Sequence, residues 1–173
     1  MVIIITGASH TGKTLLAQRL LEKYGYPYLS IDHLKMGLIR SGNTGLTPED
    51  DDDLTEYLWP IVREMIKTAI ENEQNLIVEG CYVPAEWKKD RAPGYLENIR
   101  LICLAMSDDY IDSHFDEIIR NESRIESRLI KADCTIADLK NRNRQYLDMF
   151  SRAGDIVVLI DDDYNKTMES IVI

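Results

Sequence analysis

Short apolar runs rich in β-branched residues alternate along the chain with longer segments in which apolar residues recur every three or four positions. The first pattern is typical of buried strands and the second of amphipathic helices. The expected strands span about 2–6, 27–31, 75–79, 99–106 and 155–160. The expected helices span about 13–24, 32–40, 54–72, 107–119 and 135–153, with a short helix within 84–98 and another closing the chain. Strands that alternate with helices favour βαβ units and a parallel sheet.

Single residues sharpen the limits of these elements. Ser107 is expected to cap the helix that follows it, and Thr135 with Asp138 matches a capping box. Pro60 lies inside the helix over 54–72 and is expected to kink or divide it. The five acids over 49–53 indicate a solvated loop and helix start. The buried face of the helix over 135–153 is expected to consist of Ile136, Leu139, Tyr146, Leu147 and Phe150.

Composition restricts the class of protein. A chain of 173 residues with 45% apolar residues fits one domain over 1–173. Thirty acids against twenty bases give a net charge of −10, which argues against binding to nucleic acid or to an anionic membrane. No apolar run approaches the roughly 18 residues of a membrane span, and the first residues lack a secretory pattern. The three cysteines have no zinc-site spacing, which favours reduced thiols and a cytoplasmic protein.

The strongest motif follows the first strand directly and precedes the first helix. The pattern GxxxxGK[ST] comprises Gly7, Ala8, Ser9, His10, Thr11, Gly12, Lys13 and Thr14. Its glycines let backbone N–H groups curl around phosphate oxygens, and the helix N-terminus adds partial positive charge. Lys13 is expected to reach the β- and γ-phosphates, and the Thr14 hydroxyl to ligate Mg²⁺. The motif therefore predicts a nucleoside triphosphate and Mg²⁺, with His10 as an exposed loop residue.

Charged residues also follow the second and third strands. In a doubly wound sheet, ligands bind beyond the carboxyl ends of the strands. Asp32 is expected to accept a proton from an attacking hydroxyl or to hold Mg²⁺ through water, unless it only caps the next helix. Lys35, with Arg40 beyond it, is expected to bind the acceptor, and a solvated surface lysine is the alternative. Glu79 is expected to join the Mg²⁺ shell, and Gly80 to let a ligand approach the backbone.

Arginines recur at a spacing of four near the middle of the chain. Arg120, Arg124 and Arg128 share one face if the helix continues that far, and would stabilise the charge on a transferring phosphoryl group. The alternative is an exposed face of salt bridges with the interleaved acids. Arg142 and Arg144 follow on the next helix and are expected to flank the same opening and bind the substrate.

The order of these features resembles the P-loop small-molecule kinases of the nucleoside monophosphate kinase type, which include adenylate, shikimate, gluconate and zeta-toxin-like kinases. The resemblance covers nearly the whole chain and rests on the motif at 7–14, Asp32-x-x-Lys35, Glu79-Gly80, the arginines at 120–134 and Arg142-x-Arg144. It implies a P-loop NTPase fold, a three-layer α/β/α sandwich with a five-stranded parallel sheet in the order 2-3-1-4-5. It also implies an acceptor-binding helical region at about 32–72 and a short helical lid at about 120–134.

The chain departs from the adenylate kinases at the start of the phosphate loop and after the third strand. Gly7-Ala8-Ser9-His10 replaces Gly-x-Pro-Gly, and no arginine follows Glu79-Gly80 closely. These departures favour a hydroxylated or phosphorylated metabolite over a nucleotide as acceptor. The expected function is an ATP- and Mg²⁺-dependent phosphotransferase acting on a small molecule. A nucleoside monophosphate kinase and a non-catalytic ATP-binding regulatory protein are the alternatives, and the oligomeric state is open.

Overall fold

Five parallel strands form the single sheet of the protein, seen here in a computed structural model that describes residues 1–89, 92–121 and 134–173. The strands are β1 (Val2–Gly7), β2 (Tyr28–Ser30), β3 (Leu76–Glu79), β4 (Ile99–Met106) and β5 (Ile156–Ile160). Their order is β2-β3-β1-β4-β5, and every neighbouring pair is parallel. The predicted strand order is therefore confirmed.

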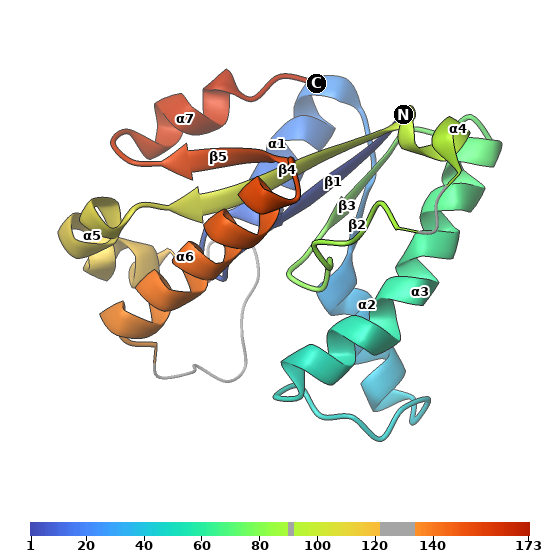
Figure 1. The fold of residues 1–173 in the computed structure, drawn as a ribbon, viewed down its shortest axis with the longest axis horizontal. Coiled ribbons are helices and arrows are strands. Elements are labelled where there is room, and N and C mark those ends of the chain that lie inside the picture. The colour runs from blue at the N-terminus through green and yellow to red at the C-terminus, as the bar shows by residue number, and fades with distance from the viewer. Residues whose placement is uncertain (90–91, 122–133) are drawn as a thin grey trace.

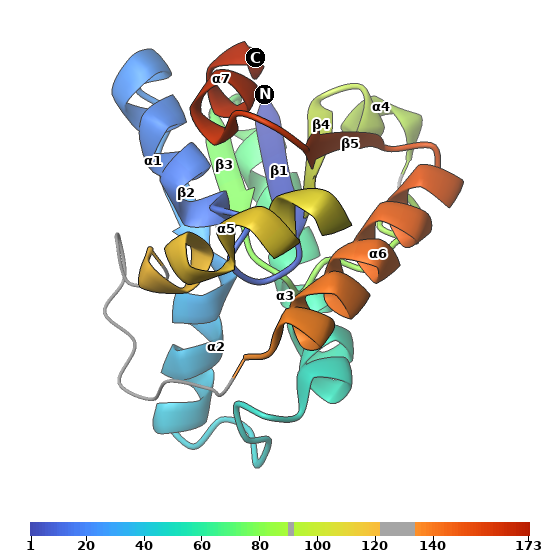
Figure 2. The ribbon, with the colours of Figure 1, turned by 90° about the vertical axis from the view of Figure 1, so that its left-hand side faces the viewer.

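Helices cover both faces of this sheet (Figures 1 and 2). They are α1 (Lys13–Tyr24), α2 (Ile31–Arg40), α3 (Asp51–Glu71), α4 (Pro93–Leu96), α5 (Asp108–Arg120), α6 (Ile136–Arg152) and α7 (Tyr164–Ser170). Buried residues of α1, α5 and α7 pack on one face, whereas α3 and the carboxyl half of α6 pack on the other. The three-layer α/β/α architecture is as predicted. Within the described residues, no helix is both long and apolar enough to cross a membrane.

The central strand β1 shows why its sequence is apolar without interruption. All six of its residues are buried, because helices cover the sheet on both sides. Side chains alternate between the faces of a strand. Val2 and Ile4 accordingly join the core under α3, and Ile3 and Ile5 join the core under α1. The carboxyl end of β1 then leads directly into the glycine-rich motif.

Several expectations about the helices need correction. Pro60 does not divide its helix, because α3 continues from Asp51 to Glu71 as one element. That helix also begins three residues earlier than predicted, so Asp51 opens its first turn instead of belonging to the loop. Ile136 was expected in the buried face of α6, but 39% of its surface is exposed. The expected caps are confirmed: the Ser107 hydroxyl accepts from Tyr110 N, and Thr135 forms the capping box with Asp138.

Candidate functional site

The loop at 7–14, which we call the phosphate loop after its sequence motif, has a backbone that favours glycine at two positions. Gly7 has φ +139°, and a Cβ there would lie 2.1 Å from the carbonyl oxygen of Leu104 on the neighbouring strand. Gly12 has φ +85°, and its Cβ would lie 1.9 Å from the Tyr164 hydroxyl. Between them His10 has φ +68°, a left-handed conformation that is uncommon outside glycine. Three positive φ values within six residues make this loop curl tightly before α1 begins.

Lys13 lies folded against this loop. Its Nζ donates to the carbonyl oxygen of Ala8 over 2.8 Å, and only 8% of the residue is exposed. The Thr11 hydroxyl donates to the same carbonyl, also over 2.8 Å. Burial of an ammonium group requires partners that replace its water. The lysine ammonium is thus hydrogen-bonded to the backbone of the loop itself.

A hydroxyl and a carboxylate meet beside the loop. Thr14 Oγ1 donates to Glu79 Oε2 over 3.2 Å, and Glu79 is 1% exposed. The parallel register pairs Ile5 with Glu79, so the end of β3 is brought next to the end of β1. Both oxygens are hard ligands of the kind that Mg²⁺ prefers, and Mg²⁺ keeps several waters or phosphate oxygens of its own. These two residues fit Mg²⁺ held together with phosphates. Among the described residues, no group of three or more His, Cys, Asp or Glu forms a site for a metal held by side chains alone.

Asp32 and Lys35 lie at the start of α2. Ser30 occupies the N-cap position and Asp32 the first turn, so capping does not account for Asp32. The Nζ of Lys35 lies 2.9 Å from Asp32 Oδ1 and donates to the Tyr82 hydroxyl over 2.8 Å. Lys35 is only 9% exposed, which corrects the alternative of a solvated surface lysine. Its ammonium also lies 4.9 Å from the centre of the Tyr82 ring.

Tyr82 connects this pair to two further helices. Its hydroxyl donates to Asp51 Oδ1 over 3.1 Å, and Asp51 Oδ2 lies 3.8 Å from Arg142 Nη1. Burial raises the pKa of Tyr82, and the charges of Asp32 and Asp51 raise it further, so its hydroxyl remains a proton donor. The five residues Asp32, Lys35, Tyr82, Asp51 and Arg142 form a chain of contacts that we call the acceptor-side network. It joins α2, the segment after β3, α3 and α6.

Asn143 fixes the place of Arg142 and Arg144. Its side chain is fully buried, accepts from Met106 N over 2.7 Å and donates to Leu139 O over 2.8 Å. Two residues apart on a helix differ by about 200° in direction. Arg142 therefore points to Asp51, while Arg144 forms an ion pair with Asp108 at the start of α5. The hydrogen bonds from Arg144 lower the pKa of Asp108.

The remaining predicted residues lie apart from these contacts. Arg40 and Arg120 are exposed at the carboxyl ends of α2 and α5. Arg124 and Arg128 lie outside the described residues, as do residues 122–133 of the lid expected at about 120–134. A Cβ on Gly80 would lie 2.8 Å from Ile31 Cβ, so packing inside the protein already explains this glycine.

The sequence interpretation missed four residues of this region: Asp51, Tyr82, Asn143 and Tyr164. Asp51 lies in an acidic run that is typical of a solvated loop. Asn143 lies between two arginines, whose charges are the stronger indication of a binding site. Tyr82 lies three residues beyond Glu79, after the carboxyl end of the same strand. Because ligands bind at this edge of such sheets, its position does indicate a site residue.

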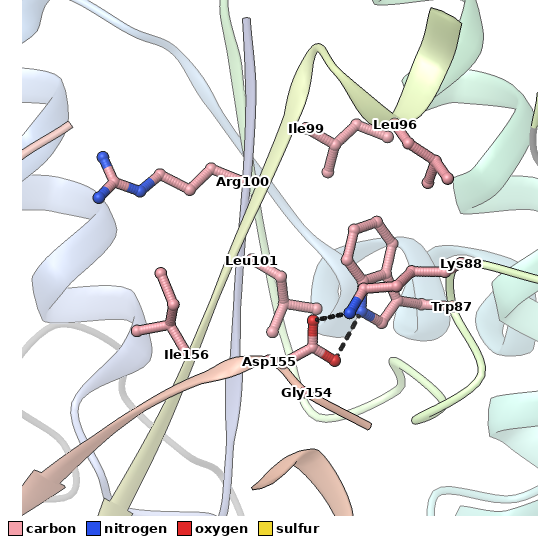
Figure 3. Close-up of a pocket in the computed structure, with 9 residues that line it drawn as sticks. All are labelled: Trp87, Lys88, Leu96, Ile99, Arg100, Leu101, Gly154, Asp155 and Ile156. Carbon is pink, nitrogen blue, oxygen red and sulfur yellow. Dashed lines mark hydrogen bonds and ion pairs between the residues drawn. The ribbon is translucent and has the colours of Figure 1, made fainter. Parts of the chain in front are cut away.

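A separate hollow of about 370 Å³ lies at the opposite, amino-terminal edge of β4 and β5 (Figure 3). Three of its polar side chains contact one another: Asp155 accepts from Trp87 Nε1 over 3.0 Å and lies 2.7 Å from Lys88 Nζ. None of the residues that line this hollow belongs to the phosphate loop or to the acceptor-side network. The hollow is therefore separate from the candidate site.

Comparison with solved structures finds the same fold in several kinases. A gluconokinase from Sinorhizobium meliloti 1021 aligns over 97% of this chain and 87% of its own, with a TM-score of 0.52 and 13% identity. The shikimate kinase of Aquifex aeolicus vf5 aligns over 98% and 92%, with a TM-score of 0.55 and 15% identity. A sugar kinase from Janibacter sp. HTCC2649 aligns over 97% and 90%, with a TM-score of 0.58 and 12% identity.

These identities relate the proteins at the level of the fold. No protein-family model matches the sequence, and no curated protein matches it. The chain accordingly shares its fold with these three kinases.

Proposed function

We propose that the protein is an ATP- and Mg²⁺-dependent phosphotransferase that acts on a small-molecule acceptor. The observation that carries this proposal is the joint position of the buried Lys13 and the Thr14–Glu79 pair beside one curled loop. The likeness to a gluconokinase, a shikimate kinase and a sugar kinase supports it at the level of fold. An acidic chain that concentrates a lysine and backbone N–H groups at one loop suits a small anionic ligand carried with a cation.

Each residue has a role in this proposal. Lys13 exchanges the Ala8 carbonyl for the β- and γ-phosphate oxygens, and the loop amides bind the remaining oxygens. Thr14 and Glu79 hold Mg²⁺, which when bound neutralises charge on the phosphates. Asp32 accepts the proton of the acceptor hydroxyl, and Lys35 fixes the position of that carboxylate.

The reaction is a single displacement at the γ-phosphorus. The acceptor oxygen forms a bond to the phosphorus, and the bond from that phosphorus to the bridging oxygen breaks, which releases ADP. The hydroxyl proton passes to Asp32, whose carboxylate lies 2.9 Å from Lys35 Nζ.

The test is an ADP-release screen over sugars, polyols, small hydroxy acids, aminoglycosides and nucleotides. We expect release with at least one class, and Lys13→Ala should lower the rate by roughly 100-fold or more, because it removes a charge that acts on the transferring group. Lys23→Ala is the matched control, since it removes the same charge from the exposed last turn of the same helix. Equal rates for the two variants would refute the assignment.

The same screen separates the alternatives. Release with a nucleoside monophosphate identifies a nucleoside monophosphate kinase. Binding of ATP that depends on Lys13, with no release for any acceptor class, identifies an ATP-binding regulatory protein. Asp32→Asn adds a check on the proton acceptor, because it should lower turnover while ATP binding persists.

A further inference from the structure

Each cation of the acceptor-side network already lies beside a carboxylate of the protein. Lys35 lies 2.9 Å from Asp32, and Arg142 lies 3.8 Å from Asp51. Tyr82 joins the two pairs by accepting from Lys35 and donating to Asp51. An anionic group on an incoming acceptor would therefore have to compete with Asp32 for Lys35 and with Asp51 for Arg142.

The surroundings make this part of the site still more negative. Asp51 belongs to an unbroken run of five acids over 49–53. Asp50 in that run is held by the Thr47 amide and hydroxyl, which donate to it over 2.8 and 2.9 Å. The first turn of α3 contains three acids and no base. A carboxylate or phosphate placed beside Asp32 and Asp51 would therefore meet like charges.

Hydroxyl groups suit the same network. A hydroxyl both donates and accepts, whereas a carboxylate or phosphate only accepts when it is ionised. Neighbouring hydroxyls can donate to Asp32 and Asp51 and accept from Lys35 and Arg142 without breaking either ion pair. An amine on the acceptor would gain further from the carboxylates.

From these observations we propose that the acceptor is an uncharged or amine-bearing polyhydroxylated compound, selected by Asp32 and Asp51 together with Lys35 and Arg142. This inference rests on the proposed phosphotransferase function. It narrows the acceptor to the sugar, polyol and amino-sugar classes and excludes phosphorylated and carboxylated metabolites.

The first test compares acceptors that differ only in charge. Matched sets are a hexose, its amino sugar, its uronic acid and its phosphate, and a nucleoside with its monophosphate. We expect ADP release with uncharged or amine-bearing members, and at least about tenfold slower release with the acid or phosphate of the same set, since one unfavourable charge contact of this kind readily reaches 1.4 kcal/mol. Faster release with the acid or phosphate overturns the inference while leaving the phosphotransferase in place.

Variants of α3 assign the effect to particular residues. Asp51→Asn removes the carboxylate that partners Tyr82 and Arg142, so the preference for uncharged acceptors should fall about tenfold. Asp52→Asn is the matched control, because it removes the same charge from the next, exposed position of the same turn. Equal loss of preference in both variants overturns the role of Asp51.

If no acceptor is turned over, that result counts against the phosphotransferase function. A measurement of phosphate binding still tests the inference about acceptor charge in that case. The Lys13→Ala protein has lost the lysine of the phosphate loop but keeps the loop amides, so Arg142→Ala is added to distinguish phosphate bound at Arg142 from phosphate bound at the loop. In NMR titrations with inorganic phosphate, we expect the same binding with and without Arg142→Ala in this background, and stronger binding when Asp51→Asn is added to Lys13→Ala. Saturable binding in Lys13→Ala that disappears with Arg142→Ala overturns the inference, because it reveals a cation open to anions.

Discussion

Substitution of Gly7 tests how closely the phosphate loop is built into the sheet. In Gly7→Ala, the new Cβ would lie 2.1 Å from Leu104 O, 2.9 Å from Leu104 N and 3.0 Å from Leu104 C. These are backbone atoms of the paired strand, since β1 and β4 align Gly7 with Leu104. A backbone cannot rotate away as a side chain can, so the two strands must separate at their carboxyl ends.

The size of the effect follows from two contributions. Backbone strain at φ +139° costs of order 1–3 kcal/mol for a residue other than glycine. Separation of the strands weakens one or two ladder hydrogen bonds, each worth about 1 kcal/mol. The sum is about 4 kcal/mol, which lowers the melting temperature of a chain of this size by roughly 12 °C.

Gly25→Ala provides the control. Gly25 has φ +73°, and a Cβ there meets nothing within 4 Å. It should lose only about 1 kcal/mol from the left-handed conformation, or roughly 3 °C. Circular dichroism during heating and in urea measures both variants. Melting temperatures within two or three degrees (about 1 kcal/mol) of each other would refute the close contact between the loop and β4.

Three further predictions follow from single residues. Pro60→Ala should raise stability by about 2 kcal/mol, seen as a higher urea midpoint, because it restores an amide donor inside α3 at an exposed position; an unchanged midpoint contradicts this. Burial raises the pKa of Cys103 to about 12, so a thiol reagent at neutral pH should modify Cys81 and Cys134 but reach Cys103 only after unfolding, and labelling of all three native thiols opposes it. Hydrogen bonds from Thr135 lower the pKa of Asp138, so the carboxylate stabilises the fold fully above its pKa in the unfolded chain and loses this effect as the pH falls through its pKa in the folded protein. Asp138→Asn should therefore lower the melting temperature at neutral pH but not at about pH 2. A difference in melting temperature that stays constant across pH counts against the capping box.

The elements were predictable where one local signal decides the structure. The β-branched runs become strands, and the loop at 7–14 follows β1 as the motif requires. The expectation that Pro60 divides its helix was wrong, because the packing of neighbouring residues opposes the local effect of the proline. Leu58, Trp59 and Val62 around the proline are buried against the sheet, and Pro60 itself is exposed, so tertiary contacts hold the helix together across it.

The sequence indicated the site residues that belong to the motif or follow a strand directly, but it did not indicate how the residues of the acceptor-side network contact one another. Lys13 and Thr14 are recognisable because eight consecutive residues carry the motif. The partners of Lys35 are different, since Tyr82 and Asp51 reach it from separate elements, and no spacing along the chain relates them. Long-range contacts of this kind depend on the strand order and on where each helix begins. Asp51 in particular enters the site only because α3 starts earlier than its apolar pattern indicates.

On α6, the residue that anchors the helix to the sheet differs from the residue that contributes to the candidate site. Asn143 is buried and bonds the end of β4 with its amide, a neutral contact that water cannot replace. Arg142 lies beside Asp51 at 3.8 Å with more than half of each side chain exposed, and such a pair contributes at most about 1 kcal/mol. Loss of Asn143 should therefore unfold or shift the helix, whereas loss of Arg142 should change what the site binds at nearly constant stability. Changes at Arg142 and Asp51 can thus be interpreted as effects on recognition, because the scaffold beneath them does not depend on their charges.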